Sequence, residues 1–537
     1  MKTTIIGVLL FIGLASIGLT GCQKGSLQSN PNVASSSTTV PVSLIFNRVT
    51  NEIYNGGGVM DAVSGSVLEG PWSQVHRWNQ YYVSLYSYYW GVNNYNWSNT
   101  ATMYSMLKYI DLMEGQITAQ YGSLPNAYAP LAKFFKAYLF VWYSQRVGDI
   151  PMTQAGNVNI LTPAYDLQHD VYKNSLALLD TANTLMGALI TAQGSNTVAG
   201  DIYGLTVAQW QKLINTYKLR VLISLSKRAV DNADLNIPTQ FANIINNPSQ
   251  YPIMSGNGDN LEFKYNAVYN KYPIFPNYAQ NDVYASLCNT FLNITTATQD
   301  PRTFIAATPA PAQITAGKTV SDFTAYVGAD INLGQSALLT NATSGMYSYP
   351  NFLRYFVDPS GTTEEPAIIV GYPEMCFNIA EAANRGWISG SIAGTWYLNG
   401  INASMAMYGL KDGTVLTIGD RGGTTLGTTT VSVSNFLANP AVVYAGNTAA
   451  GLTQILTQKY VAFWQNSGWE AFYNWRRTGV PAFGQGGAGI GTPNNMIPIR
   501  WQYPNDEAVE NTANWQKAIT SQYGGTDDIT QPMWLIK

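Results

Sequence analysis

The chain has 537 residues, of which 46% are hydrophobic and 11% are charged, and its formal net charge is −3. This length and hydrophobic content are sufficient for a large folded core. The near balance of charges, without a basic stripe along any expected helix, excludes nucleic acid as a partner. Because aromatic residues reach 12% while charged residues are scarce, uncharged polar and aromatic side chains must form much of the surface.

The first 21 residues have the features of a secretory signal peptide. Lys2 is followed by an apolar run over residues 5–14, and small residues precede Cys22. The ending Leu19-Thr20-Gly21-Cys22 resembles a bacterial lipobox, which implies that Cys22 is acylated and becomes the first residue of the mature chain. Acyl chains contribute about 0.8 kcal/mol per buried CH₂, enough together for stable membrane attachment. The alternative is an ordinary secreted protein in which this cysteine is coincidental.

A flexible tether is expected after the anchor. Residues 22–40 are rich in Ser, Thr, Asn and Gly and show no periodicity. No later segment offers eighteen consecutive apolar residues. We therefore expect a single domain over residues 41–537 that is attached to a membrane without spanning it.

Histidines and cysteines give little sign of catalysis or of a metal site. His76 and His169 lie far apart, and neither has a second His or Cys at metal-ligand spacing. A Ser-His-Asp triad is not indicated either. Cys288 and Cys376 could pair outside the cytoplasm, but no spacing demands it, so we expect two free, buried thiols.

Helical periodicity dominates the body of the chain. Apolar residues recur at helical spacing over residues 101–120, 131–142, 171–185, 207–228, 373–385, 394–408 and 452–464. Asp166 and Thr206 are expected to cap the third and fourth of these helices. Prolines, glycines and asparagines interrupt residues 235–365, which leaves short helices near 239–245 and 283–292, and a short hairpin is expected at 428–433. This pattern predicts an all-α, solenoid-like scaffold of helix pairs with long irregular loop insertions and little β structure.

One short stretch, YYVSLYSYYWGVNNYNW at residues 81–97, is crowded with aromatic rings. The spacing of its rings predicts a helix with core side chains over residues 81–89, ending near Gly91. Trp90, Tyr95 and Trp97 would then lie on an asparagine-rich loop. Flat rings beside amides match the apolar face and the hydroxyls of a sugar, so these three residues are candidate ligand contacts. The alternative is that they anchor the loop against the scaffold.

A second candidate is YNAVYNKYPIFPNY at residues 265–278, which is rich in rings and amides and broken by prolines. Binding loops are expected in such irregular segments on a rigid scaffold. Its candidate ligand contacts are Tyr269, Tyr272 and Tyr278.

Other motifs favour structural explanations. Residues 484–489 satisfy G-x-G-x-x-G, but prolines on both sides indicate a loop rather than a dinucleotide site. Arg476 and Arg477 are expected to form structural ion pairs rather than to clamp an anion. Residues 358–365 offer three carboxylates that could hold calcium, although they lack the ligand spacing of an EF-hand. No pair of carboxylates is singled out as the acid and base of a glycoside hydrolase.

Several stretches together resemble the SusD/RagB family of outer-membrane nutrient-binding lipoproteins, in particular its SusD-like subgroup. The matching stretches are Ala137-Tyr138-Leu139-Phe140, Arg146-Val147-Gly148-Asp149-Ile150-Pro151-Met152, Asp201-Ile202-Tyr203-Gly204, Trp210-Gln211-Lys212-Leu213-Ile214-Asn215, Asp300-Pro301-Arg302, Glu381-Ala382-Ala383-Asn384-Arg385-Gly386-Trp387, Trp475-Arg476-Arg477-Thr478-Gly479-Val480-Pro481 and Ile499-Arg500-Trp501-Gln502-Tyr503-Pro504. Each is weak alone, and their order behind a lipobox is what carries the resemblance.

The resemblance implies a tetratricopeptide-like helical fold and a role in nutrient uptake. A member of this family would be lipid-anchored at the cell surface, bind an oligosaccharide or a peptide, and deliver it to a SusC-like TonB-dependent outer-membrane transporter. It would not be an enzyme and would need no cofactor. One departure is that Gln23-Lys24-Gly25-Ser26 follows the cysteine, where surface-exported members often carry acidic residues. An alternative is an assembly subunit of an outer-membrane complex without a small ligand of its own.

Overall fold

The computed structural model describes residues 39–54, 69–85, 93, 95, 104–266, 268, 270, 272–273, 285–356, 365–390, 392–485 and 496–537. It divides the chain into two units, Met1–Pro41 and Val42–Lys537. The expected signal peptide, Cys22 and nearly all of the expected tether lie outside the described residues. All described helices and strands belong to the second unit.

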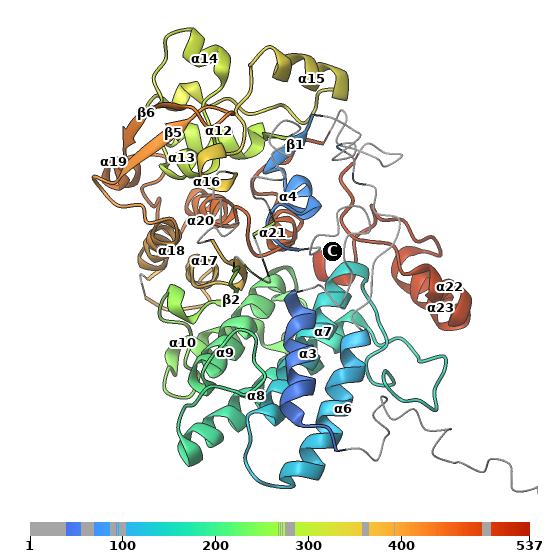
Figure 1. Cartoon of the computed structure of the whole chain (residues 1–537). Helices are drawn as coiled ribbons and strands as arrows, with labels where there is room; N and C mark the ends of the chain where they lie inside the picture. The colour runs from blue at the N-terminus through green and yellow to red at the C-terminus, as the bar shows by residue number, and fades with distance from the viewer. Residues whose placement is uncertain are drawn as a thin grey trace, which may run out of the picture. The chain divides into compact units, whose positions relative to one another are not determined.

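The helices of the second unit pack in chain order. The first group, coloured blue to green in Figure 1, contains α3 (Val42–Tyr54), α6 (Tyr104–Tyr121), α7 (Tyr128–Val147), α8 (Gln168–Gln193), α9 (Val207–Ser224) and α10 (Ile237–Asn246). Each of these six helices packs against the next one named. The second group contains α17 (Tyr372–Asn384), α18 (Ala393–Met407) and α20 (Ala449–Ala462), and α17 also packs against α9. The predicted all-α scaffold of packed helices is therefore confirmed.

Shorter helices fill the irregular segments between and after these groups. They are α4 (Gln74–Trp78), α12 (Asn289–Ala297), α13 (Arg302–Ala306), α14 (Pro311–Thr315), α15 (Gln335–Thr343), α16 (Phe352–Tyr355), α19 (Val433–Ala438), α21 (Glu470–Thr478), α22 (Asn505–Glu510) and α23 (Thr512–Tyr523).

The core of the first helical group is aromatic. Phe134 on α7 is fully buried, and its ring meets Trp210 and Tyr217 of α9 edge to face, at centroid distances of 5.8 and 5.6 Å. Phe46 on α3 meets Trp210 at 6.3 Å. Edge-to-face pairs contribute about 0.5–1.5 kcal/mol each beyond the area that they bury. These rings therefore hold α3, α7 and α9 together.

Thr206 caps α9, as predicted from the sequence. Its hydroxyl accepts a hydrogen bond from the backbone N–H of Gln209, and the Gln209 side chain accepts one from the backbone N–H of Thr206. This reciprocal capping box satisfies two N–H groups that the helix itself leaves unpaired. We expect Thr206→Ala to lower the free energy of unfolding by about 1 kcal/mol. Urea denaturation followed by circular dichroism would measure this loss, and a variant as stable as wild type would contradict it.

Asp166 does not cap α8, so this prediction is wrong. The first backbone N–H of the helix, that of Gln168, instead donates to Asp149 Oδ1 at 2.8 Å. Asp166 Oδ2 accepts from the backbone N–H groups of Met152 and Thr153, at 2.8 and 2.9 Å. Asp166 therefore stabilises the turn that follows α7, and the cap of α8 comes from the end of the preceding helix. Burial raises the pKa of Asp149 to about 6.

The described strands form three two-stranded antiparallel sheets. They pair β1 (Tyr82–Ser84) with β3 (Ala285–Leu287), β2 (Leu261–Phe263) with β4 (Ala367–Val370), and β5 (Val415–Gly419) with β6 (Thr425–Thr430). The prediction of helices over residues 81–89 and 283–292 is therefore wrong for the residues that form β1 and β3. The helix α12 begins only at residue 289. The hairpin exists, but it spans residues 415–430 rather than 428–433.

Buried ion pairs explain two of the family-like motifs. Arg477 on α21 donates to both carboxylate oxygens of Glu381 on α17, at 2.5 and 2.9 Å. Arg302 is paired with Asp300 at 2.6 Å, and both side chains are buried. The expected structural ion pair of Arg477 is confirmed. Arg476 differs from the expectation, because it donates to the backbone carbonyls of Gln145 and Ile499.

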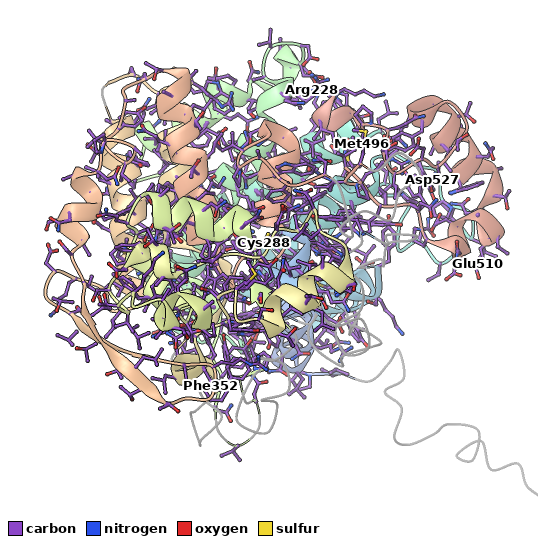
Figure 2. All side chains as sticks on the ribbon, turned by 90° about the horizontal axis from the view of Figure 1, so that it is seen from above. Arg228, Cys288, Phe352, Met496, Glu510 and Asp527 are labelled. Atoms are coloured by element: carbon purple, nitrogen blue, oxygen red, sulfur yellow. The ribbon has the colours of Figure 1, made fainter. Side chains whose placement is uncertain are left out.

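Both described cysteines are free and buried, as predicted. Cys288 lies among the side chains of the interior (Figure 2), and burial raises its pKa to about 11. Burial raises the pKa of Cys376 to about 12. Both therefore stay as neutral thiols at physiological pH.

Among the described helices, α8 alone is long and apolar enough to cross a membrane by length and composition. Its mean hydropathy reaches 1.2 over eighteen residues. It packs along α7 on one side and α9 on the other. Helices in the core of a folded protein can be equally long and apolar, so the length and hydropathy of α8 are weak evidence for a membrane span.

Candidate functional site

The pairing of β1 with β3 relates the two ring-rich segments, because β1 belongs to the first and β3 follows the second in the chain. Ser84 lies opposite Ala285 at one end of the ladder. The chain leaves β1 there toward the first segment, and it enters β3 there from the second. The first segment therefore continues from the end of the β1–β3 ladder at which β3 begins.

Asn93 fixes the far end of the first loop to the same ladder. Its Oδ1 accepts from the backbone N–H of Ser84, and its Nδ2 donates to the backbone carbonyl of Ser84, both at 2.7 Å. The side chain is buried. Two hydrogen bonds to one residue therefore clamp the ends of the segment between Ser84 and Asn93.

Tyr95 was expected on a binding surface, and the structure places its ring in the interior. The side chain is 2% exposed. Its hydroxyl donates to the backbone carbonyl of Trp78 at 2.9 Å and accepts from Gln80 Nε2 at 3.0 Å. Because its polar group is satisfied inside the protein, Tyr95 anchors the loop in this structure, which was the alternative interpretation of the sequence.

Gln80 joins three segments beneath the candidate site. Its Nε2 donates to Tyr95 and to the carbonyl of Gly484, and its Oε1 accepts from Thr290 Oγ1 and the Gly484 N–H. Gln80 is fully buried and has a φ of 58°, in the left-handed region. A non-glycine residue in this region is strained, and such strain persists only where the surroundings fix it.

Tyr272, the described candidate of the second segment, is also fully buried. Its hydroxyl accepts from Trp72 Nε1 at 2.9 Å, and its ring stacks on Tyr355 at a centroid distance of 6.3 Å. The structure thus gives Tyr272 a packing position rather than the expected surface position. The other candidates, Trp90, Trp97, Tyr269 and Tyr278, lie outside the described residues.

Sequence reasoning missed the aromatic base on which the second segment rests. Trp72 meets Tyr355 and Trp464 edge to face, at centroid distances of 4.9 and 5.8 Å. Trp464 Nε1 donates to the Tyr355 hydroxyl at 3.0 Å. These rings come from segments far apart in the sequence, so periodicity within one segment gave no signal for their contact.

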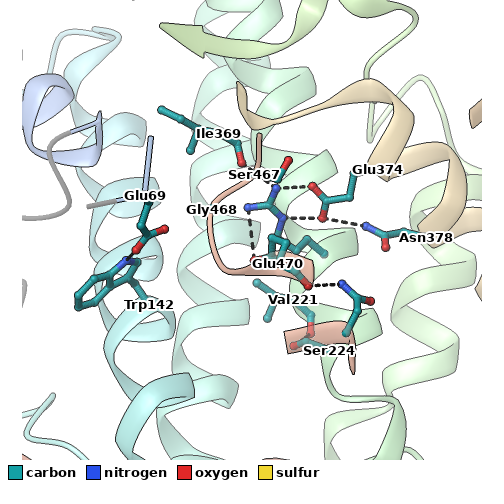
Figure 3. A network of polar contacts seen from close by, with 12 residues as sticks. Glu69, Trp142, Val221, Ser224, Ile369, Glu374, Asn378, Ser467, Gly468 and Glu470 are labelled. Atoms are coloured by element: carbon teal, nitrogen blue, oxygen red, sulfur yellow. Dashed lines mark hydrogen bonds and ion pairs between the residues drawn. The ribbon is translucent and has the colours of Figure 1, made fainter. Parts of the chain in front are cut away.

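A polar network lies in the interior between the two helical groups. Arg220 on α9 is paired with Glu374 on α17, donates to the carbonyl of Ile369 at 2.8 Å, and lies 3.8 Å from Glu470 on α21 (Figure 3). Burial raises the pKa of Glu470. Because removing one partner of a buried pair leaves an uncompensated charge, this network couples the two helical groups.

The cavity beside this network is relevant to hydrolysis, because two carboxylates, Glu69 and Glu470, line it. That cavity has a volume of about 60 Å³. This space suits a few water molecules, whereas ligand sites usually measure about 300–1,000 Å³. Each also faces an arginine, Glu69 being paired with Arg146 and Glu470 lying 3.8 Å from Arg220. The geometry fits a structural ion network better than a glycosidase centre.

Among the described residues, no group of three or more His, Cys, Asp and Glu side chains is arranged to hold a metal ion. Glu365, at the end of the carboxylate-rich loop considered for calcium, is paired with Arg354. The remaining residues of that loop, 358–364, lie outside the described part of the chain.

Comparison with solved structures agrees with this architecture. A SusD homologue from Bacteroides fragilis is 28% identical, with a TM-score of 0.77, and covers 93% of this chain and 100% of its own. An outer-membrane protein from Bacteroides vulgatus, described in connection with nutrient binding, is 26% identical, with a TM-score of 0.74 and the same coverage. A chitin-binding SusD homologue from Flavobacterium johnsoniae shares the fold at 19% identity and a TM-score of 0.65, covering 92% of this chain and 98% of its own.

The family comparison is consistent with these structural neighbours. No curated protein is a significant match to this chain. Residues 32–504 match the SusD-like family that is described as starch-binding and associating with the outer membrane. The match covers most of the chain, so this protein belongs to the SusD-like family of outer-membrane-associated binding proteins.

Proposed function

We propose that the protein binds an oligosaccharide at the two ring-rich segments, residues 81–97 and 265–278, and delivers it to a TonB-dependent outer-membrane transporter. In this proposal acylated Cys22 anchors the protein at the cell surface, and the protein carries out no chemistry on its ligand. A peptide is the alternative ligand.

The observation that carries the proposal is the pairing of Ser84 with Ala285. It supports the proposal because the chain passes from β1 into the rest of the first ring-rich segment at this pair and reaches β3 at the same pair after the second one. Aromatic rings bury large areas with little loss of side-chain entropy, and amides can bind the hydroxyls of a sugar. The names of the structural neighbours, which include a chitin-binding homologue, support a glycan as the ligand class.

We expect Trp97→Ala to weaken oligosaccharide binding at least tenfold, because the loss of a stacking ring removes about 1.4 kcal/mol or more. Calorimetry of residues 23–537 against a panel of oligosaccharides and short peptides would measure this effect. Wild-type affinity is expected to be micromolar, about −8.2 kcal/mol. Trp515→Ala on α23, a half-buried tryptophan outside the candidate loops, is the matched control.

Three outcomes would contradict parts of the proposal. Equal binding by wild type and Trp97→Ala would move the site away from the first loop. Shorter products after incubation would indicate a glycoside hydrolase. Binding of no solute, together with co-purification of a large β-barrel, would favour an interaction subunit.

The interaction subunit is a second candidate because the segment between α7 and α8, and the helix bonded to it, expose apolar side chains. Val158 and Leu161 are each 87% exposed in the segment between α7 and α8, and Val509 on α22 is 79% exposed. The segment is bonded to α22 and α23 through Tyr165 and Asn514. If a partner protein covered these side chains, it would remove this apolar surface from water.

A further inference from the structure

Two described lysines are buried, and their surroundings differ. Lys218 on α9 is 4% exposed, and its ammonium group lies 2.6 Å from the carboxylate of Asp180. Lys459 on α20 is 1% exposed, and the described hydrogen bonds of its ammonium group go to amide oxygens. A buried charge is costly unless a group of opposite charge contacts it. Among its described contacts, Lys459 lacks the direct charge partner that Lys218 has.

The Nζ atom of Lys459 is held between two asparagines. It donates to Asn378 Oδ1 on α17 at 2.6 Å and to Asn474 Oδ1 on α21 at 2.8 Å. Because a C=O bond is about 1.23 Å long, Nζ lies roughly 3–4 Å from Cγ of Asn378. Reacting atoms in near-attack conformations are about 3–3.5 Å apart. The packing of α20 on α17 thus places an amine beside an amide carbon that it can attack.

Glu374 lies at the other end of the same amide. Its carboxylate is paired with Arg220, and its Oε1 accepts from Asn378 Nδ2 at 3.4 Å (Figure 3). Nδ2 is the atom that must gain a proton before it can leave as ammonia. A carboxylate within reach of this atom can relay that proton.

Burial favours the reactive form of Lys459. It lowers the pKa of this ammonium group from 10.5 to about 8. At pH 7 about one molecule in ten then carries a neutral amine here. Only the neutral amine has the lone pair that nucleophilic attack requires. Asn378 is 1% exposed, so bulk water does not reach the reacting atoms.

We propose that Lys459 and Asn378 form an isopeptide cross-link that joins α20 to α17. The neutral Nζ attacks Cγ of Asn378, and a new N–C bond forms. A proton passes from Nζ through Glu374 to Nδ2, the Cγ–Nδ2 bond breaks, and ammonia leaves. The reaction needs no oxidant and no cofactor, and it replaces a buried charge with a neutral amide. The bond closes a covalent loop that contains α18, α19 and the β5–β6 hairpin, and it does not depend on the proposed ligand binding.

Intact-mass spectrometry of residues 23–537 tests this proposal. We expect the wild-type chain to be lighter than its sequence mass by one molecule of ammonia. Lys459→Met and Asn378→Leu should each have the full sequence mass, because one reactant is missing. Asn474→Leu and Lys218→Met are the matched controls and should keep the loss of ammonia.

Tryptic digestion then locates the bond, because an N-terminal Gln23 or an asparagine that precedes glycine can also lose ammonia. The proposed bond joins the peptide of residues 355–385 to that of residues 422–476, and it blocks cleavage after Lys459. A bond to Asn474 would instead lie within residues 422–476.

Three results would overturn the proposal. These are a full sequence mass for wild type, a loss of ammonia that persists in Lys459→Met, and a bond that maps to Asn474. The digest of the wild-type chain decides the question even if a variant fails to fold, because the two peptides are either linked or separate.

Discussion

Replacing Arg477 with methionine is expected to lower the free energy of unfolding by about 3–5 kcal/mol, because it leaves Glu381 as a buried charge without its main partner. The Glu381 side chain is fully buried and that of Arg477 is 4% exposed. Arg477 also donates to Ser226 at 2.7 Å and Asn474 at 2.9 Å. One side chain thus connects α17, α21 and the short 3-10 helix η1 (Ser226–Arg228) that follows α9.

Arg385→Met is the matched control for this effect. Arg385 contacts the same carboxylate oxygen of Glu381 at 2.8 Å, but its side chain is 27% exposed. Pairs with a solvent-accessible partner contribute about 0–1 kcal/mol. Urea denaturation of the two variants should therefore separate them by several kcal/mol. Equal losses would show that burial does not set the strength of the Arg477 pair.

The same pair predicts a pH dependence at acidic pH. Burial alone would raise the pKa of Glu381, but Arg477, with smaller contributions from Arg385 and Lys459, outweighs burial and lowers this pKa from 4.5 to about 2. A carboxyl group with a lower pKa in the folded state stabilises the protein above its unfolded pKa. That contribution, about 3 kcal/mol, is lost as the pH falls from about 4.5 toward 2. Arg477→Met should show a smaller loss over this range.

Wild type is expected to show a second acid-induced loss of stability, at higher pH than the loss caused by protonation of Glu381. The substitution His76→Phe should remove this second loss. Burial lowers the pKa of His76 from 6.5 to about 3. Below pH 6.5 the unfolded chain binds a proton at this imidazole, while the folded protein does not until the pH approaches 3. Stability therefore falls as the pH drops through this range, by up to about 5 kcal/mol, and phenylalanine abolishes that fall.

Thermal unfolding of wild type and variant between pH 6.5 and 4.5 would measure the effect of His76 apart from that of Glu381. Asp149, whose pKa burial raises to about 6, acts in the opposite sense, so the difference between variant and wild type is the relevant quantity. His76→Leu shows whether poor packing of the phenylalanine, rather than loss of the imidazole, changes the stability. His169→Gln controls for the loss of a histidine at the surface. Parallel pH profiles for wild type and both His76 variants would contradict the prediction.

The parts of the fold that depend on local sequence were predictable. Long helices such as α6 and α17 show regular apolar spacing, and the partner of Thr206 lies three residues away in the same helix. Asp166 failed as a cap because the choice between it and Asp149 is made by the packing of two helices, which no local pattern records.

The ring-rich stretch shows where periodicity misleads. Tyr81, Tyr82 and Leu85 are buried, as predicted, but residues 82–84 form a strand. A strand buried on both faces has apolar residues at every spacing, including helical spacing, so burial can be predicted while the conformation cannot. For the candidate site, composition singled out the two ring-rich segments. The pairing of β1 with β3, which lies beside them in the chain, could not be predicted from composition.

The two hydrogen bonds between Asn93 and Ser84 should let the segment between these residues change in length. They hold the ends of the segment together whatever number of residues lies between them. Doubling the length of a flexible loop costs only about 0.6 kcal/mol of closure entropy. Insertions, deletions and exchanged sequences between the buried Leu85 and Asn93 should therefore leave the scaffold intact. Such tolerance would let ligand preference diverge among related chains without refolding the rest of the molecule, and it makes this loop a practical position for a randomised library.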